Sequence, residues 1–173
     1  MGYIELKPGR GAFAAITSKE REREKAKFGI SWFEANAVKI YEWQEARMCV
    51  EPHMCAIAAQ KATEKERAAL SKNIEDFAKN ADSGNLEELC RLEYEFHDLL
   101  SAMTHNPLVI ALYGEMRKLF KEFVTNGTYK DKTFEHTVNE HKRIADAVVG
   151  GDGYGAKKAM EEHLASSANK IPV

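Results

Sequence analysis

The 173-residue chain lacks several features that mark common protein classes. No apolar run approaches the ~20 residues of a membrane span, and the N-terminal residues lack the apolar core of a signal peptide. There is no polybasic segment, and the formal net charge is −2. Most of the chain is therefore not a surface for nucleic acid or anionic membrane. We expect a cytoplasmic protein without a membrane partner.

Cysteine is scarce, and its spacing carries no recognisable motif. Cys49, Cys55 and Cys90 are odd in number and include no Cys-x-x-Cys pair. Because they lie among apolar neighbours in helical patterns, we interpret them as reduced thiols of the core. A catalytic or disulfide role is the less favoured alternative.

Several catalytic motifs are also missing. The chain contains no His-Glu-x-x-His, which excludes the zinc-protease arrangement. It contains no Glu-x-x-His, which disfavours a di-iron carboxylate bundle. No glycine-rich phosphate loop is present. The sequence thus assigns no catalytic residue.

Most of the chain consists of helical patterns. Only the stretch from Tyr3 to Phe13 alternates apolar and polar residues around a Pro-Gly turn, which predicts a β-hairpin. The alternating charges of residues 17–30 predict either a solvated linker helix or a floppy charged linker. Helix starts or breaks are predicted at Ser31, Thr63, Asn85, Asn106-Pro107, after residues 126–128 and at Gly150–Asp152, with a kink or split at Pro52. Short connections favour an all-α antiparallel bundle of about six helices over residues 31–173.

Four possible metal ligands lie on apolar helical stripes: Glu93, His97, His141 and His163. The stripe neighbours are Leu86, Leu89, Leu100 and Met103 for the first two, Phe134, Val138, Ala145 and Val148 for His141, and Ala156, Met160 and Ser167 for His163. A buried carboxylate beside buried imidazoles is costly unless a charge compensates, and a divalent cation is the simplest compensator. We therefore hypothesise a shared metal site.

Simpler interpretations of these residues stay open. Each histidine alone could be a hydrogen-bonded core residue, and Glu93 could pair with Arg91 or extend to solvent. Three imidazoles and one carboxylate suit zinc, nickel, iron or manganese better than calcium or magnesium. In a six-coordinate site, two positions would remain for a bidentate carboxylate.

Arg47 lies on an apolar stripe with Ile40, Trp43, Val50 and Met54. Its guanidinium could hold a carboxylate of an effector. Alternatively, it could extend outward or pair with Glu51, one turn further along the helix. His53, His105 and His136 lie outside the stripes or near breaks, and we expect them at the surface.

A set of short segments, in one order along the chain, resembles a known family. The segments are Glu45-Ala46-Arg47 through Glu51, Ile57-Ala58-Ala59 with Thr63, Phe96-His97, Thr104-His105-Asn106-Pro107-Leu108, Glu140-His141 with Ile144 and Ala147, Gly151-Asp152, Ala159 and His163-Leu164. From about Trp32 onward, the chain resembles the C-terminal effector-binding (FCD) domain of GntR-type transcription regulators of the FadR branch. The resemblance implies a metal bound by Glu93, His97, His141 and His163, where the family usually has aspartate at the first position. It also implies a homodimer.

Residues 1–16 resemble the wing of the winged helix-turn-helix domain that precedes the effector domain in this family. The resemblance implies that the wing tip, Lys7, Gly9, Arg10 and Gly11, contacts DNA phosphates. No recognition helix precedes it, and two cationic side chains are too few for stable specific binding. We expect DNA binding only through a complete winged-helix domain, so the chain is either a fragment of a longer regulator or a shortened version.

The expected function is that of a sensor rather than an enzyme. A small carboxylate metabolite would bind the metal, with zinc as first choice, together with Arg47, and would thereby modulate DNA binding. The main alternative is a metal-dependent enzyme in which the three-histidine site activates water. Against that alternative, no inward general base is evident beyond the ligands. A purely structural metal is the third possibility.

Overall fold

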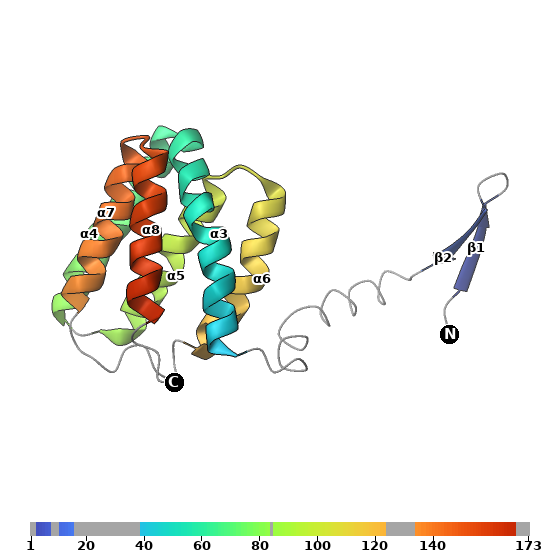
Figure 1. The fold of residues 1–173 in the computed structure, drawn as a ribbon, viewed down its shortest axis with the longest axis horizontal. Helices are drawn as coiled ribbons and strands as arrows, with labels where there is room; N and C mark the ends of the chain where they lie inside the picture. Colours follow the sequence, from blue (N-terminus) through green and yellow to red (C-terminus); the bar gives the residue numbers. More distant parts are fainter. Residues whose placement is uncertain (1–2, 8–10, 16–38, 84, 124–133, 169–173) are drawn as a thin grey trace. The chain divides into compact units, whose positions relative to one another are not determined.

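The structure, a computed structural model, describes residues 3–7, 11–15, 39–83, 85–123 and 134–168 (Figure 1). It divides into two compact units, Met1–Val38 and Lys39–Val173. The described part of the first unit is an antiparallel hairpin of β1 (Tyr3–Lys7) and β2 (Gly11–Ala15), in which Tyr3 pairs with Ala15. The predicted hairpin is therefore present. Gly9, Arg10 and the linker predicted at residues 17–30 lie outside the described residues.

The second unit confirms the predicted all-α bundle, with six helices among its described residues. They are α3 (Ile40–Lys61), α4 (Glu64–Ser83), α5 (Leu86–Ala102), α6 (Pro107–Phe123), α7 (Phe134–Val149) and α8 (Gly153–Ala168). Helix α8 lies beside α3 and α7, while α4 packs against α5 and α7 (Figure 1). Helix α6 packs mainly against α3 and α5. None of the described helices is long and apolar enough to cross a membrane.

Side-chain caps fix the starts of α4, α5 and α6 where the sequence predicts them. The Thr63 backbone N–H donates to Glu66 Oε2 at 2.8 Å, and the Glu66 N–H donates to Thr63 Oγ1 at 3.4 Å, which completes a capping box. Asn85 Oδ1 accepts from the Glu88 N–H, and Asn106 Oδ1 accepts from the Leu108 N–H. Each cap satisfies backbone donors that the first helical turn leaves without a partner.

Of the kink or split predicted at Pro52, the split is wrong, because α3 is one helix from Ile40 to Lys61 with Pro52 inside it. Proline removes one backbone donor from the helix interior. Pro52 is buried, and α3 packs along α8, so tertiary contacts hold the helix together across it. The start predicted at Ser31 lies outside the described residues.

A tight glycine turn joins α7 to α8. Gly151 has φ of 75°, its N–H donates to the Val148 carbonyl at 3.1 Å, and the Asp152 N–H donates to the Ala147 carbonyl at 2.9 Å. This pattern is a Schellman C-cap. Asp152 Oδ1 then accepts from the Gly155 N–H and caps α8. The turn makes α7 and α8 antiparallel neighbours, so residues about three turns from it on either helix lie at the same level.

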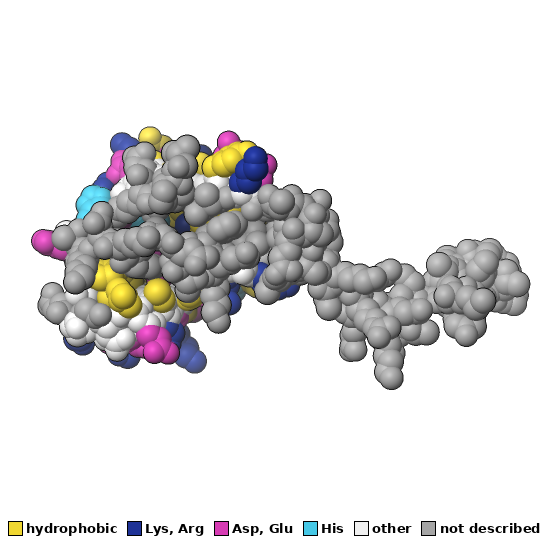
Figure 2. All heavy atoms as spheres, turned by 90° about the horizontal axis from the view of Figure 1, so that it is seen from below, with side chains coloured by type: hydrophobic (Ala, Val, Ile, Leu, Met, Phe, Trp, Pro, Cys, Tyr) yellow, Lys and Arg dark blue, Asp and Glu magenta, His cyan; other side chains and the backbone are white. Residues whose placement is uncertain are grey.

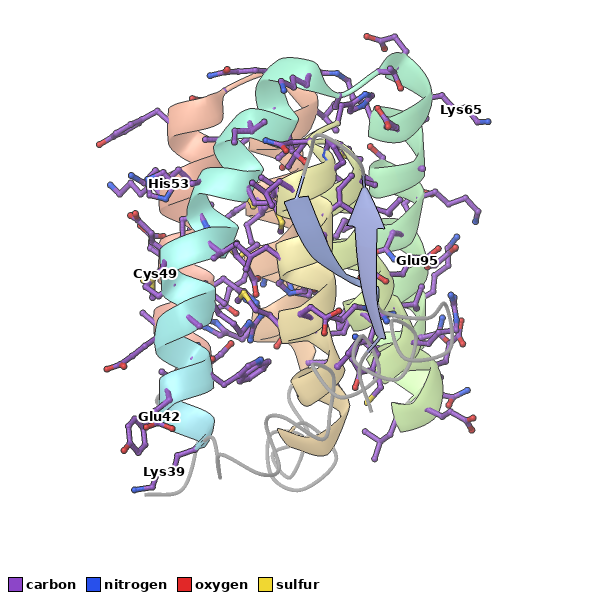
Figure 3. All side chains as sticks on the ribbon, turned by 90° about the vertical axis from the view of Figure 1, so that its right-hand side faces the viewer. Lys39, Glu42, Cys49, His53, Lys65 and Glu95 are labelled. Atoms are coloured by element: carbon purple, nitrogen blue, oxygen red, sulfur yellow. The ribbon has the colours of Figure 1, made fainter. Side chains whose placement is uncertain are left out.

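The exposed side chains correct two details of the sequence analysis. Cys55 is buried, but Cys49 is exposed and projects from the outer side of α3, as does His53 (Figure 3). Cys49 is therefore not a core thiol, since its apolar neighbours in sequence belong to other faces of the same helix. Leu86 is 48% exposed because it stands in the first turn of α5, beyond the packed part of the bundle. On the face drawn in Figure 2, basic side chains lie among acidic ones.

Candidate metal site

Three helices bring the four predicted ligands together in the core. Helix α5 buries one stripe at spacings of three and four residues, and Glu93 and His97 lie on it between Leu89 and Leu100. His141 comes from α7 and His163 from α8. All four side chains are buried, and one ligand atom from each lies within 4.8 Å of the others.

Glu93 stands between two of the imidazoles. Its Oε1 is 3.5 Å from His97 Nε2, and its Oε2 is 3.3 Å from His141 Nε2. Two ligands held at about 2.1 Å from one tetrahedral zinc ion lie roughly 3.4 Å apart. The spacing of the Glu93 oxygens and the two Nε2 atoms therefore suits coordination of one ion.

Several of these polar atoms have no hydrogen-bond partner among the described residues. They are Glu93 Oε2, both ring nitrogens of His141 and His163 Nε2, and all are buried. The 3.3 Å contact between Glu93 and His141 is close but is not aligned as a hydrogen bond. A buried polar atom without a partner costs about 1–3 kcal/mol. A cation bound here would coordinate Glu93 Oε2 and one ring nitrogen of each of His141 and His163, so the residues present fit a metal ion.

His97 and His163 each have a carboxylate from a neighbouring helix beside Nδ1. His97 Nδ1 is 2.8 Å from Glu51 Oε2, and His163 Nδ1 is 3.1 Å from Glu140 Oε2. His97 and His163 are thus core histidines with hydrogen-bonding partners, as the simpler interpretation allows. His97 Nε2 nevertheless lies 3.5 Å from Glu93 Oε1, and His163 Nε2 is buried without a hydrogen-bond partner among the described residues, which that interpretation does not explain.

His141 is held by aromatic packing. Its ring stacks on Phe96, with centroids 4.2 Å apart and planes at 14°, and it is tilted against Phe77 at 5.3 Å. Both phenyl rings are fully buried. The apolar contacts fix the ring plane of His141 without supplying a hydrogen-bond acceptor.

Arg47 faces the core and pairs with Glu51, which is one of the alternatives expected from the sequence. It is 5% exposed, its Nε donates to Glu51 Oε1 at 2.6 Å, and its Nη2 donates to Glu51 Oε2 at 3.3 Å. The guanidinium also lies over the Trp43 ring, 4.8 Å from the centroid. Arg47, Glu51 and His97 therefore form a continuous chain from α3 to the cluster.

Burial and neighbouring charges set the protonation of the site. Burial opposes ionisation of Glu51, but Arg47 and His97 outweigh it and lower its pKa to about 2. Burial likewise opposes ionisation of Glu93, and His141 and His97 hold its pKa well below the usual range. Burial lowers the pKa of His163 to about 4, which leaves a neutral imidazole able to donate a lone pair.

His97 differs from His163 in its charge state. Burial lowers its pKa, but Glu51 and Glu93 more than offset that effect, so its pKa is raised above 6.5. Without a cation, His97 therefore tends to carry its second proton between two carboxylates. A metal that binds Nε2 must displace this proton, which makes metal affinity pH-dependent.

The acidic residues that flank the site in sequence do not reach it. Glu95 pairs with Arg91 at 3.1 Å, and Asp98 pairs with Arg117 at 2.7 Å. Arg91 also pairs with Glu88, so the suggested alternative partner of Glu93 is engaged elsewhere. His53, His105 and His136 are exposed, as expected.

Sequence reasoning missed the two outer carboxylates. Glu51 was considered only as a partner of Arg47, and the signal that could have found it is its place one turn beyond Arg47 on the inward stripe of α3. Glu140 precedes the candidate ligand His141, so its side chain leaves α7 in a different direction and reaches α8 instead. Helical periodicity within α7 alone does not reveal that contact.

Comparisons with known proteins identify the family. The FCD domain model matches residues 42–166, which include all four cluster residues and Arg47. The chain belongs to the FCD domain family. The HTH-type transcriptional regulator YcbG of Bacillus subtilis is 32% identical over 127 residues, which cover 73% of this chain and 52% of YcbG. The chain therefore spans about half the length of that relative.

Other FCD relatives cover more of the chain. The galactonate operon transcriptional repressor of Escherichia coli is 25% identical over 175 residues, 97% of this chain and 73% of the repressor. The fold is similar to that of Streptococcus agalactiae GntR, with a TM-score of 0.63 and 19% identity over 94% of this chain and 72% of that one. The resemblance to GntR-type regulators is confirmed. Because the relatives are transcription regulators, the prediction that the FCD chain is not an enzyme is also confirmed.

Proposed function

We propose that this FCD chain is the ligand-sensing part of a GntR-type regulator of the FadR branch. It binds one divalent transition metal through Glu93, His97, His141 and His163, with zinc as first choice and nickel, iron or manganese as alternatives. A small carboxylate metabolite completes the coordination and contacts Arg47. The convergence of four buried ligand atoms, several without another partner, carries this proposal.

The buried charges support an anionic effector. Among the groups on α3 and α5, Arg47 contributes +1, Glu51 and Glu93 contribute −1 each, and His97 in the neutral form that binds a metal contributes nothing, so these groups sum to −1. Glu140 on α7 is left out of this sum because its second oxygen lies 2.8 Å from the exposed His136 at the edge of the bundle. A divalent cation changes this sum to +1. One monocarboxylate would return it to zero, and a charge is buried at least cost when it is paired. One relative is named as the repressor of a galactonate operon, and galactonate is a carboxylate of this kind.

Arg47 would meet the effector in competition with Glu51. Its Nε and Nη2 already donate to Glu51, so an effector carboxylate must share or draw away part of the guanidinium. Such an exchange would move Glu51 relative to His97. Effector binding would thus alter the packing of α3 against α5, the kind of differential contact that shifts a conformational equilibrium.

In this proposal, DNA binding requires a complete winged helix-turn-helix domain. Residues 1–16 correspond to the wing of a winged helix-turn-helix domain, whose tip residues Lys7, Gly9, Arg10 and Gly11 would contact phosphates. Residues 17–30 are the linker, and residues 31–173 are the effector domain. The regulator would act in the cytoplasm as a homodimer, because two half-sites on DNA match a two-fold protein.

The first test is metal content, measured by elemental analysis after reconstitution with zinc and removal of excess. We expect about one equivalent in the wild type and a loss in both His97→Ala and His141→Ala. His53→Ala removes an exposed histidine of α3 and should keep the metal, which controls for adventitious binding at the surface.

A carboxylate screen by thermal shift follows, with and without zinc. Stabilisation by a monocarboxylate that appears only with zinc and weakens in Arg47→Lys would support the sensor. A wild type that takes up no metal after reconstitution would refute it. Stabilisation by zinc with no response to any carboxylate would instead indicate a structural metal.

A further inference from the structure

Two acidic residues outside the candidate ligand set lie beside the Nδ1 atoms of imidazoles in the cluster. Glu51 Oε2 lies 2.8 Å from His97 Nδ1, and Glu140 Oε2 lies 3.1 Å from His163 Nδ1. Each contact crosses between helices, from α3 to α5 and from α7 to α8. The opposite nitrogen of His97 lies 3.5 Å from Glu93 Oε1, and the opposite nitrogen of His163 is buried without a hydrogen-bond partner among the described residues.

We infer that Glu51 and Glu140 are positioning residues for the metal site. Each carboxylate accepts the proton on Nδ1 of its histidine, which leaves the lone pair on Nε2 for the metal and fixes the rotation of the ring. This inference rests on the proposed function, because it assumes that the cluster binds a metal.

The physical basis is the chemistry of neutral imidazole. The ring carries one proton, and the nitrogen without it is the one that can bind a metal. A carboxylate beside one nitrogen retains the proton there and makes the opposite nitrogen a stronger ligand. The unpartnered His163 Nε2 is the atom that this arrangement leaves exposed to the cluster.

The two carboxylates differ in how firmly they are held. Glu51 is 1% exposed, and two donors of Arg47 fix its oxygens in place. Glu140 is 8% exposed, and its second oxygen lies 2.8 Å from Nε2 of His136, whose side chain is 62% exposed. Removal of the Glu51 charge should therefore affect metal affinity more strongly, because water can partly replace Glu140 at the edge of the bundle.

His141 provides an internal contrast. Its Nε2 lies 3.3 Å from Glu93 Oε2, but its Nδ1 has no hydrogen-bond partner among the described residues, and stacking on Phe96 fixes its ring. Substitution of Glu51 or Glu140 should thus disturb one histidine each and leave His141 in place. The expected result is a weakened site with altered geometry, rather than a lost site.

The test compares zinc affinity in the full chain for the wild type, Glu51→Gln and Glu140→Gln. Glutamine keeps the side-chain volume and removes the charge. Competition with a chromophoric chelator gives the affinity, and the visible absorption of the Co²⁺-loaded protein gives the ligand geometry. Loss of such a partner typically weakens metal binding by about 10–100-fold. We expect a loss near the upper end of this range for Glu51→Gln and near the lower end for Glu140→Gln, each with a changed Co²⁺ spectrum.

Glu88→Gln is the matched control. It removes a carboxylate of α5 that pairs with Arg91 at 2.7 Å on the surface, away from the cluster. Its zinc affinity and Co²⁺ spectrum should equal those of the wild type. Wild-type affinity and spectrum in both Glu51→Gln and Glu140→Gln would overturn the inference.

A second measurement covers the case in which Glu51→Gln does not fold because Arg47 loses its counter-charge. In zinc-loaded wild type with ¹⁵N-labelled histidine, NMR should find the ring proton of His97 and His163 on Nδ1. A ring proton on Nε2 of either residue would contradict the assignment. A wild type that binds neither Zn²⁺ nor Co²⁺ would reject the proposed function as well, whereas normal binding with unaffected variants would reject the positioning role alone.

Discussion

The neutral state of His163 predicts a specific acid sensitivity of the metal-free chain. His163 is 2% exposed, and burial lowers its pKa from 6.5 to about 4. A shift of 2.5 units corresponds to about 3 kcal/mol, at about 1.4 kcal/mol for each unit. We therefore expect His163 to contribute a stabilisation of about 3 kcal/mol at neutral pH that disappears in acid.

The direction follows from proton linkage. The unfolded chain protonates His163 near pH 6.5, while the folded chain keeps it neutral down to about pH 4. The folded state thus binds fewer protons in this window. The contribution is complete above about pH 6.5, falls by at most about 1.4 kcal/mol for each pH unit, and is lost as the pH passes through about 4.

Urea denaturation with a chelator present, at several pH values from 8 to 4, provides the assay. The difference in unfolding free energy between the wild type and His163→Gln should shrink across this window by about 3 kcal/mol. The subtraction removes contributions common to both proteins, including that of His97, whose pKa moves in the opposite direction. A difference that stays constant from pH 8 to pH 4 would refute the neutral buried imidazole. Zinc at 100 times its dissociation constant should add about 2.7 kcal/mol near neutral pH and lose this effect in acid.

Four further substitutions test other features of the bundle. Arg67→Ala should lower the unfolding free energy by about 2–4 kcal/mol without changing zinc stoichiometry, because Arg67 donates to carbonyls at the ends of both α3 and α7; an effect below 0.5 kcal/mol in denaturant titrations would contradict this role. Glu93→Asp shortens the anionic side chain by one methylene and should retain one zinc, with about tenfold lower zinc affinity measured by competition with a chelator. Complete loss of zinc would show that the carboxylate must reach further. Gly151→Ala should destabilise the chain by about 1 kcal/mol because of its φ of 75°, whereas Gly114→Ala, inside α6 with open space around it, should stabilise it by about 0.5–1 kcal/mol in the same thermal melts. Equal effects at the two glycines would argue against the turn geometry.

Sequence rules that act within a few residues predicted the starts of three helices. The starts of α4, α5 and α6 follow from Thr63, Asn85 and Asn106, since a cap acts within three residues of itself. The continuity of α3 across Pro52 did not follow, because the packing along α8 that stabilises this helix involves residues about 100 positions away. Cys49 was misplaced for a related reason, since the apolar residues around it in the sequence face other sides of α3.

The sequence could likewise predict one part of the candidate site, whereas another part depends on tertiary packing. Glu93 and His97 share one helix face, and a buried charge on such a face needs a partner, so the sequence alone could predict a cluster. Which atoms of the cluster face inward depends on Glu51 and Glu140, and both reach their histidines from another helix. Tertiary packing therefore decides which ring nitrogens lie beside a carboxylate, even where helical periodicity indicates the candidate ligands.

The pairing of Arg47 with Glu51 gives the proposed sensor a physical link between its two ligands. Removal of one member of a buried ion pair leaves an uncompensated charge. An effector that draws Arg47 away would therefore leave His97 as the remaining charged partner of the Glu51 carboxylate. Without the charge of Arg47 beside it, the Glu51 carboxylate holds the proton on Nδ1 of His97 more firmly, which strengthens Nε2 of the same ring as a ligand. Within this scheme metal and effector favour each other's binding, and thermodynamic reciprocity requires the same coupling free energy in both directions. The buried acidic residue on α3, rather than the arginine alone, would then transmit the presence of effector to the metal centre.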